Sequence, residues 1–247
     1  MSAGARWKRP AAVAVPRVWR RCAGRTPLDG KLPRFVIQDV PDDLHDAVVA
    51  FMSTFFPRDE PICAHLKLWT DAQSLAELQG LWRETLRQHV ALVALLEDAA
   101  GGAPRIVGCN LLAVLYKEDQ GQPNPYKGFA MRAFLEALNY HNTVVDPFER
   151  FGAAEALVGF GLSIDPAFRG QGLGLELLRA RFDLGRAVGL RLTYTVFTAI
   201  QSQTLGARVG MDTLVEVCYK DYRDNGEPVL AGISFPPSMK LQARPID

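Results

Sequence analysis

Apolar side chains recur at helical spacing soon after the first short apolar run that predicts a strand. The run Phe35-Val36-Ile37 predicts a short buried strand, and Pro41-Asp42-Asp43 predicts the start of a helix that one of the two aspartates caps. Pro57 and Pro61 are expected to end this helix. Its apolar stripe follows spacings of three and four residues and comprises Leu44, Ala47, Val48, Phe51, Met52 and Phe55.

Strands and helices alternate through the remainder of the chain. A second amphipathic helix is predicted from Thr70, with Gln73 as its capping-box partner. Two apolar runs, 90–96 and 106–116, are separated by glycines that predict a hairpin. Further elements are predicted in this order: a helix over 130–140, a strand over 157–164, a helix to about 189, a strand over 192–197, a helix over 202–209 and strands over 214–219 and 229–233. This order predicts an α/β fold with a mixed central sheet flanked by helices.

Charge divides the chain unevenly. Residues 1–31 hold eight basic residues and one acid, Asp29, although the whole chain carries a net charge of only +1. We therefore predict a basic N-terminal extension, residues 1–31, that lies on the acidic remainder, followed by one domain, residues 32–247. An arginine-rich start also suits a mitochondrial transit peptide, but this one is broken by prolines and holds a single serine. The predicted location is cytoplasmic, with mitochondria as the alternative.

Composition excludes several classes of protein. Hydrophobic residues make up 48% and charged residues 22% of the 247 residues, which is typical of a folded domain and not of a disordered chain. The balanced charge gives no bulk attraction to nucleic acid or to an acidic membrane. No apolar run approaches the roughly 20 residues of a membrane-spanning helix. We expect a monomer that acts on a small molecule.

Cysteines and histidines show no ligand pattern. The four cysteines form no C-x-x-C pair, so reduced thiols are expected. The histidines lie far apart in the sequence, which argues against metal catalysis, and no metal site is predicted. They are His45, His65, His89 and His141.

A glycine-rich turn between a predicted strand and a predicted helix is the most informative stretch. It reads Arg169-Gly170-Gln171-Gly172-Leu173-Gly174. Unpaired N–H groups at the helix start, the helix dipole and the missing Cβ atoms together favour a pyrophosphate group. A dinucleotide fingerprint would need glycine where Leu175 stands, and the Gly-Lys-Ser/Thr of a Walker A loop is absent.

The turn instead matches the pattern R/Q-x-x-G-x-G/A after a strand that ends in hydrophobic-x-Pro, here residues 164–174. This resembles motif A of the GNAT superfamily of acyl-CoA-dependent N-acetyltransferases, whose order of elements is similar to that of the chain from Phe35 onward. Residues 55–61 (FFPRDEP) resemble the F-F-x-x-[DE]-E-P segment of insect-type arylalkylamine, or dopamine, N-acetyltransferases. Residues 219–226 resemble their Y-x-D-Y-x-x-x-G tail.

A third segment of that family, T-S-x-x-S-x(7)-G, is matched incompletely. Thr198, Ser202 and Gly210 agree with it, but Ala199 stands at the first serine. A proton relay that uses both serines is therefore in doubt in this chain. Ala199 also leaves open a catalytically idle acyl-CoA-binding protein.

The resemblance implies transfer of an acetyl group from acetyl-CoA to the primary amine of an arylalkylamine such as dopamine, tryptamine or serotonin. By resemblance, Glu60 is the general base and residues 169–174 bind the pyrophosphate. Backbone N–H groups of Leu162, Ser163 and Ile164 are expected to stabilise the oxyanion and contact the cofactor. Ser202 is expected to contact the cofactor and to protonate the leaving thiolate, with Tyr219 and Tyr222 as weaker candidates.

Several alternatives remain open from sequence. The acceptor could be a polyamine, an amino acid or a protein amine, because acceptor choice depends on loop contacts. Glu60 could be one more solvated acid, and Ser202 could be a plain helix cap. Four aromatic residues, any of which could equally be core, are candidates for the wall of an arylamine pocket: Phe55, Phe56, Trp69 and Trp82. Residues 1–31 are expected to be dispensable for the chemistry.

Overall fold

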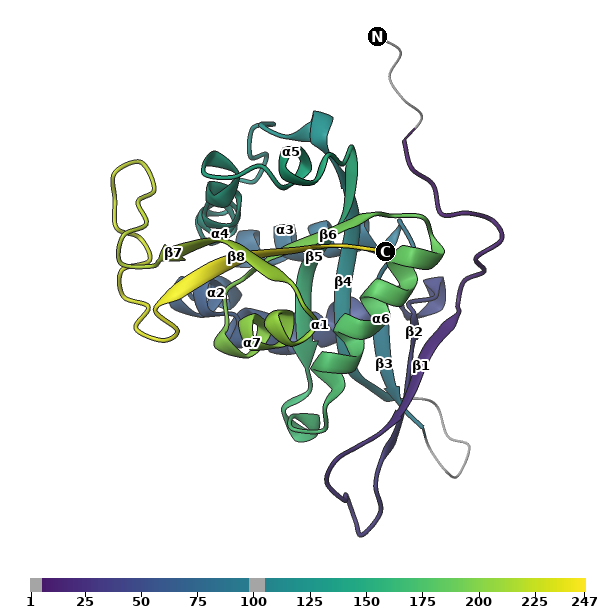
Figure 1. Ribbon diagram of the computed structural model, residues 1–247. Helices are drawn as coiled ribbons and strands as arrows, with labels where there is room; N and C mark the ends of the chain where they lie inside the picture. The colour runs from purple at the N-terminus through teal and green to yellow at the C-terminus, as the bar shows by residue number, and fades with distance from the viewer. Residues whose placement is uncertain (1–5, 98–104) are drawn as a thin grey trace.

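A mixed sheet of eight strands runs through the molecule in the order β1-β2-β3-β4-β5-β6-β8-β7 (Figure 1). The computed structural model describes residues 6–97 and 105–247. Strands β5 and β6 are parallel, and the other neighbouring strands are antiparallel. The strands are β1 (Val18–Ala23), β2 (Arg34–Asp39), β3 (Leu92–Leu96), β4 (Arg105–Tyr116), β5 (Glu155–Ile164), β6 (Leu192–Phe197), β7 (Asp212–Cys218) and β8 (Ser238–Pro245).

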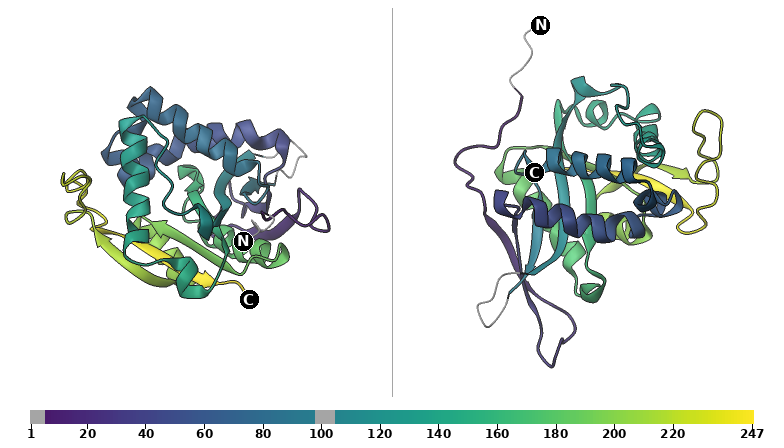
Figure 2. Two further views of the ribbon diagram at one scale, coloured as in Figure 1. Left: turned by 90° about the horizontal axis from the view of Figure 1, so that it is seen from above. Right: turned by 180° about the vertical axis from the view of Figure 1, so that it is seen from behind.

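Helices cover both faces of the sheet (Figures 1 and 2). One face packs against α1 (His45–Asp59), α2 (Pro61–His65), α3 (Ala72–Leu86) and α4 (Phe129–Asn139) through a core that includes Met52, Trp82 and Phe134. The other face packs against α6 (Leu173–Ala187), with α7 (Ile200–Arg208) beside it. The short α5 (Pro147–Phe151) contributes Phe148 to a third apolar cluster. Because β3 and β4 are buried on both faces, their sequences are continuous apolar runs.

The predicted α/β architecture is confirmed, with local differences at helix ends. Pro57 does not end α1: the helix continues to Asp59, and the Glu60 N–H still donates to the Phe56 carbonyl at 2.9 Å. Neither Asp42 nor Asp43 caps α1; both lie in a 3₁₀ turn, η1 (Asp42–Leu44), that precedes it. The start of α3 is capped by Asp71, which accepts hydrogen bonds from the N–H groups of Gln73 and Ser74.

The strand predicted over 229–233 is wrong. That segment forms turns, and the last strand of the sheet is β8, inserted between β6 and β7. The sequence of β8 shows no clear apolar alternation. Met239 and Leu241 are buried, but so is the polar Gln242, whose amide nitrogen donates to the Thr213 hydroxyl at 3.1 Å. The predicted pairing of β3 with β4 is confirmed, and the glycine loop between them lies outside the described residues.

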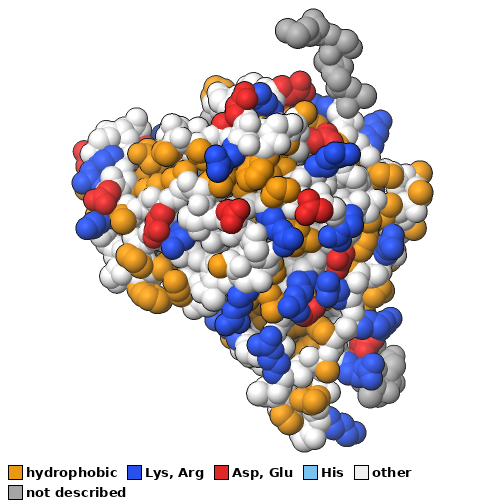
Figure 3. Space-filling model, in the orientation of Figure 1, with side chains coloured by type: hydrophobic (Ala, Val, Ile, Leu, Met, Phe, Trp, Pro, Cys, Tyr) orange, Lys and Arg blue, Asp and Glu red, His pale blue; other side chains and the backbone are white. Residues whose placement is uncertain are grey.

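The basic N-terminal extension contributes to the sheet. Its residues 18–23 form β1, which pairs with β2, although no strand was predicted there. As predicted, the extension lies on acidic groups: Arg9 pairs with Asp39 at 2.7 Å where both side chains are buried, and Arg20 pairs with Asp183 at 2.9 Å. Figure 3, viewed as Figure 1, shows Lys and Arg side chains gathered over the lower right of the molecule with acidic side chains among them. The domain boundary at residue 32 stays a prediction.

Among the helices of residues 6–97 and 105–247, none is long and apolar enough to span a bilayer.

Candidate active site

The parallel strands β5 and β6 separate after a short paired stretch. They pair only at Leu157–Thr193 and Val158–Tyr194. Beyond this point a cavity of about 460 Å³ opens, lined by residues 159–164 of β5 on one side and residues 195–199 on the other. A cavity of this size lies within the range of small-molecule sites, roughly 300–1,000 Å³.

Arg181 of α6 fills the base of this fork. Its guanidinium donates to the Leu157 carbonyl at 2.9 Å and to the Tyr194 carbonyl at 2.7 Å, so it joins the two strands where their own hydrogen bonds stop. The side chain is 1% exposed, and burial lowers its pKa to about 9. This arrangement holds the fork open at a fixed width.

A bulge turns β5 toward the cavity. The register with β4 shifts between Leu111 and Leu112, where Gly161 and Gly159 are the facing residues. Gly161 has φ +150°, and a Cβ there would lie 2.7 Å from the Met52 methyl, so only glycine fits. The predicted oxyanion segment, residues 162–164, lines the cavity directly after this bulge. Since β5 has no strand partner on that side, N–H groups that point there face the cavity.

The glycine loop lies at the other end of the cavity, where α6 begins. Gly170, Gly172 and Gly174 line it together with Arg169 and Leu173, as predicted. Gly172 is the N-cap of α6, with φ +90° and no side chain capping the free N–H groups. A Cβ at Gly174 would lie 2.8 Å from the Leu205 side chain. The loop therefore offers unpartnered donors and close access, which fits a pyrophosphate group.

Gln171 does not take the cofactor-facing position predicted for it. Its amide is buried and clamps the β1–β2 connection: Oε1 accepts from the N–H groups of Arg25 (2.7 Å) and Thr26 (3.0 Å), and Nε2 donates to the Thr26 hydroxyl (2.7 Å). The clamp places Arg25 on the cavity wall, where its Nε would lie 2.8 Å from a Cβ on Gly172. The extension is thus connected to the site, and whether residues 1–31 are dispensable for the chemistry stays a prediction. Arg25 carries no sequence signal because its position depends on the hairpin.

Glu60 lines the cavity and is not a solvated acid. It is 7% exposed, caps α2, and accepts hydrogen bonds from the N–H groups of Ile62 (3.2 Å) and Cys63 (2.6 Å). Burial raises the pKa of its carboxyl group, and interactions with Cys63 and Thr198 partly oppose that shift. The neighbouring Asp59 is exposed and forms an ion pair with Arg169.

Ser202 also lines the cavity, but it does not cap α7. Ala199 is the N-cap, and the Ser202 hydroxyl donates to the Ala199 carbonyl at 2.8 Å within the first turn. The two tyrosines proposed as alternatives are excluded by their positions. Tyr219 is buried with its hydroxyl donating to the Thr198 carbonyl at 2.9 Å, and Tyr222 packs edge-on against Tyr140.

Of the four aromatic residues proposed for the pocket wall, only Phe56 lines the cavity. Trp82 is fully buried and donates to the Phe160 carbonyl at 3.2 Å, whereas Trp69 stacks under Arg58. The pattern predicted the helices but not which side of α4 faces the cavity. Further apolar wall residues include Leu81, Phe134, Leu135, Leu138 and Phe160.

Comparison with known proteins identifies the family. No protein-family model and no curated protein sequence matches the chain. Among solved structures, a protein of the yellow fever mosquito Aedes aegypti named arylalkylamine N-acetyltransferase 7 superposes with a TM-score of 0.90 and 30% identity, over 98% of this chain and 100% of that one. The chain belongs to the insect arylalkylamine N-acetyltransferase family. The enzyme is therefore an acyltransferase with the GNAT fold, as the sequence motifs predicted.

More distant structures share the fold of the enzyme. Arylalkylamine N-acetyltransferase 2 of Aedes aegypti gives a TM-score of 0.77 at 23% identity, over 86% of this chain and 99% of that one. An agmatine N-acetyltransferase gives 0.71 at 19% identity, over 85% and 99%. These two proteins act on different amines by name, so the fold alone does not assign the acceptor.

Proposed function

We propose that the enzyme transfers the acetyl group of acetyl-CoA to the primary amine of an arylalkylamine. The observation that carries this proposal is the pairing of one buried carboxylate with an apolar wall. Among the described residues that line the cavity, the acids are Asp59 and Glu60, and Arg169 neutralises Asp59. A single free acid suits a substrate with one ammonium group. The remaining wall near Glu60, with Phe56 and Phe134 on it, suits an aromatic ring.

A polyamine fits this cavity less well. Its second ammonium group would need another acidic partner, because a desolvated unpaired charge is costly. The rest of the cavity wall offers cationic side chains instead, among them Arg25 and Arg208. These guanidinium groups suit the phosphates of the cosubstrate and repel a second ammonium group.

Glu60 removes the proton from the acceptor. A primary amine with a pKa of roughly 10.4 arrives as an ammonium ion and cannot attack until it is deprotonated. Because burial raises the pKa of Glu60 above its ordinary value, the carboxylate is a stronger base than a solvated glutamate. The N–H groups of Ile62 and Cys63 hold it in place, either to take the proton directly or to act through a water molecule.

The chain supplies the remaining parts of the reaction from both strands of the fork. Acetyl-CoA, when bound, supplies the activated acetyl group. The glycine loop donates N–H groups to its pyrophosphate, and N–H groups of residues 162–164 stabilise the negative charge that develops on the acetyl oxygen. The Ser202 hydroxyl lines the same cavity, and to donate to the departing sulfur it would rotate away from the Ala199 carbonyl, to which it donates at 2.8 Å.

A substrate panel tests the proposal. Purified enzyme is assayed with acetyl-CoA and dopamine, tryptamine, serotonin, spermidine or agmatine, with release of the CoA thiol as the readout. We expect kcat/KM for the best arylalkylamine to exceed that for either polyamine by at least about tenfold, the discrimination that one mismatched polar or apolar contact supports. A polyamine as the best substrate would overturn the acceptor class. Binding of acetyl-CoA without turnover of any amine would indicate an idle binder.

A further inference from the structure

Asp42, His45 and His89 form a cluster outside the active site. Asp42 lies in η1, His45 begins α1, and His89 lies in the turn between α3 and β3. One ligand atom from each residue lies within 4.8 Å of the other two. Sequence spacing argued against a metal site because the histidines are far apart in the chain, but folding brings two of them together.

The distances within the cluster match metal ligands better than hydrogen-bonded partners. Asp42 Oδ1 lies 3.5 Å from His45 Nε2 and 3.6 Å from His89 Nδ1. Protein hydrogen bonds to nitrogen span roughly 2.7–3.2 Å, so both separations are too long. Ligands at roughly 2.0–2.1 Å from a tetrahedral Zn²⁺ lie about 3.4 Å from one another. Both Asp42 separations therefore match those of neighbouring ligands on one ion, and the two imidazole nitrogens lie within 4.8 Å of each other.

The facing atoms also lack other partners. His45 Nε2 and His89 Nδ1 are both shielded from solvent, and neither has a hydrogen-bond partner within residues 6–97 and 105–247. Buried polar atoms in proteins are nearly always satisfied, so two such atoms beside one carboxylate require an explanation. The Asp42 side chain is not used as a helix cap. His89 also has φ +54°, a left-handed conformation that is uncommon outside glycine.

Neighbouring charges do not oppose a cation here. Arg9 donates to the His89 carbonyl and so fixes that part of the turn. Its positive charge is neutralised by Asp39, which lies 2.7 Å away. Asp42, by contrast, is largely exposed and close to the two imidazole rings, whose centroids are 6.2 Å apart.

We propose that Asp42, His45 and His89 bind a first-row transition-metal dication of the Zn²⁺ type. Two imidazoles and one carboxylate suit Zn²⁺ and its neighbours, whereas Ca²⁺ and Mg²⁺ take oxygen ligands. Three protein ligands leave a fourth position for water. The 15 residues of α1 separate His45 from Glu60 by about 22 Å, so the ion would not reach the substrate. Its effect is to tie the start of α1 to the turn before β3.

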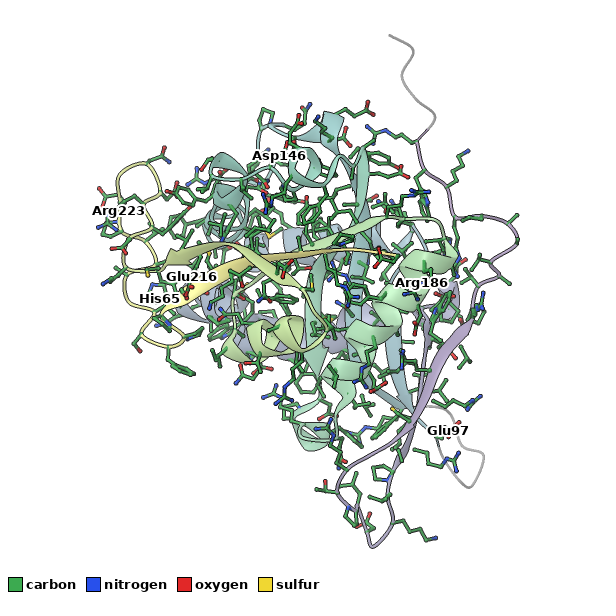
Figure 4. All side chains as sticks on the ribbon, viewed as in Figure 1. His65, Glu97, Asp146, Arg186, Glu216 and Arg223 are labelled. Atoms are coloured by element: carbon green, nitrogen blue, oxygen red, sulfur yellow. The ribbon has the colours of Figure 1, made fainter. Side chains whose placement is uncertain are left out.

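Titration of metal-free enzyme with ZnCl₂ tests this site. After removal of metal with a chelator, Zn²⁺ binding is measured by calorimetry and by the shift in Tm, and Co²⁺ is used as a visible-absorption probe of tetrahedral coordination. Asp42→Asn, His45→Gln and His89→Asn each remove one ligand; asparagine is chosen at position 89 because it tolerates the left-handed conformation. The matched control is His65→Gln, since His65, labelled in Figure 4, is not part of the cluster and contacts the Val229 carbonyl at 3.1 Å.

We expect one equivalent of Zn²⁺ in the wild type and in His65→Gln. Each ligand variant should bind at least tenfold more weakly, since loss of even an outer partner costs 10–100-fold. All three positions are at the surface or half-buried, so the folded state should survive. Unchanged Zn²⁺ affinity in His45→Gln and His89→Asn would overturn the proposal, as would an equal Tm shift with Mg²⁺ in place of Zn²⁺. Because these readouts do not involve acetyl transfer, they stand apart from the proposed function.

Discussion

Replacing Glu60 by glutamine separates its role as a helix cap from its role as a base. The carboxylate accepts one hydrogen bond from Cys63 N at 2.6 Å and another from Ile62 N at 3.2 Å. Glutamine retains one acceptor oxygen, which can keep the shorter bond. The lost bond is worth about 0.5–1.5 kcal/mol, and removal of a buried charge offsets part of that loss. The variant should therefore fold.

The difference in Tm between Glu60→Gln and the wild type should depend on pH in a defined direction. Burial raises the pKa of Glu60 above its ordinary value of 4.5, so the folded state holds the proton more tightly than the unfolded state. The stability that this contributes is fully present below the unfolded pKa and is lost as pH rises through the folded pKa. Glutamine does not titrate. Relative to the wild type, the Tm of Glu60→Gln should increase as pH rises across that interval.

Activity should fall much more than stability. Loss of a positioned general base lowers kcat/KM by about 10²–10⁴, which corresponds to about 2.7–5.5 kcal/mol of barrier. The acidic limb of the pH profile should disappear, whereas the Tm shift caused by acetyl-CoA should remain. The assay is CoA thiol release with tryptamine over a range of pH.

Asp59→Asn is the matched control because it changes the adjacent acid. Asp59 is exposed and its ion pair with Arg169 lies at the surface, so we expect an effect within about 1 kcal/mol. A Glu60→Gln enzyme that keeps kcat within about threefold of the wild type, or an Asp59→Asn enzyme that is the more damaged of the two, would refute the assignment of the base.

Further predictions concern the cofactor end of the cavity and the N-terminal segment. Arg25→Ala should weaken acetyl-CoA binding about tenfold, the value of one charged hydrogen bond, whereas Arg21→Ala on the same hairpin should not; calorimetry decides. Gly172→Val, which is strained at φ +90°, and Gly174→Asp should each abolish the stabilisation of the fold by acetyl-CoA. In the wild type this stabilisation is about 2.7 kcal/mol at a hundredfold excess over Kd. A retained Tm shift in either variant would contradict the loop assignment. The sequence alone predicts that residues 1–31 are dispensable for the chemistry. Their deletion should nevertheless lower Tm and raise KM for acetyl-CoA. An unchanged Tm would show that β1 is not part of the stable fold.

The loss of stability expected on deletion of residues 1–31 follows from one buried ion pair. Arg9 and Asp39 are 7% and 0% exposed in their side chains, and Asp39 also accepts from Trp19 Nε1 at 2.8 Å. The deletion leaves the carboxylate of Asp39 without these donors. Removal of one partner from a buried pair costs about 3–5 kcal/mol, which is a large part of the stability of a domain.

The sequence predicted those elements whose signals are local. The strands that became β2 to β6 were found because each is rich in apolar or β-branched residues, and β7 was found although only Val215 of it is buried. The helices α1, α3, α4 and α6 were found because their apolar stripes repeat at helical spacing. β1 was missed because it is an edge strand with exposed, basic residues, so that no apolar alternation marks it. β8 was missed because its buried residues include polar ones, such as Gln242, whose amide nitrogen finds its partner only when β8 pairs with β7.

The site residues also divide into those marked by a local sequence motif and those brought to the cavity by tertiary packing. Glu60, the glycine loop and Ser202 lie in motifs, and the structure brings them to one cavity. Arg25, Phe134 and Phe160 could not be found, because they reach the cavity through pairing of the hairpin, packing of α4 and the bulge in β5. The roles of all these residues, the monomeric state and the cytoplasmic location stay predictions.

The fate of the proton taken up by Glu60 follows from Ala199. A relay through two serine hydroxyls cannot operate here, since Ala199 has no hydroxyl. The side chain that interacts with Glu60 is instead that of Thr198, from the end of β6. The Thr198 carbonyl is in turn fixed by the buried Tyr219 hydroxyl, whose pKa is raised by burial so that it remains a donor. We therefore predict that a proton taken up by Glu60 leaves by way of Thr198 or the cavity and not along a pair of serine hydroxyls.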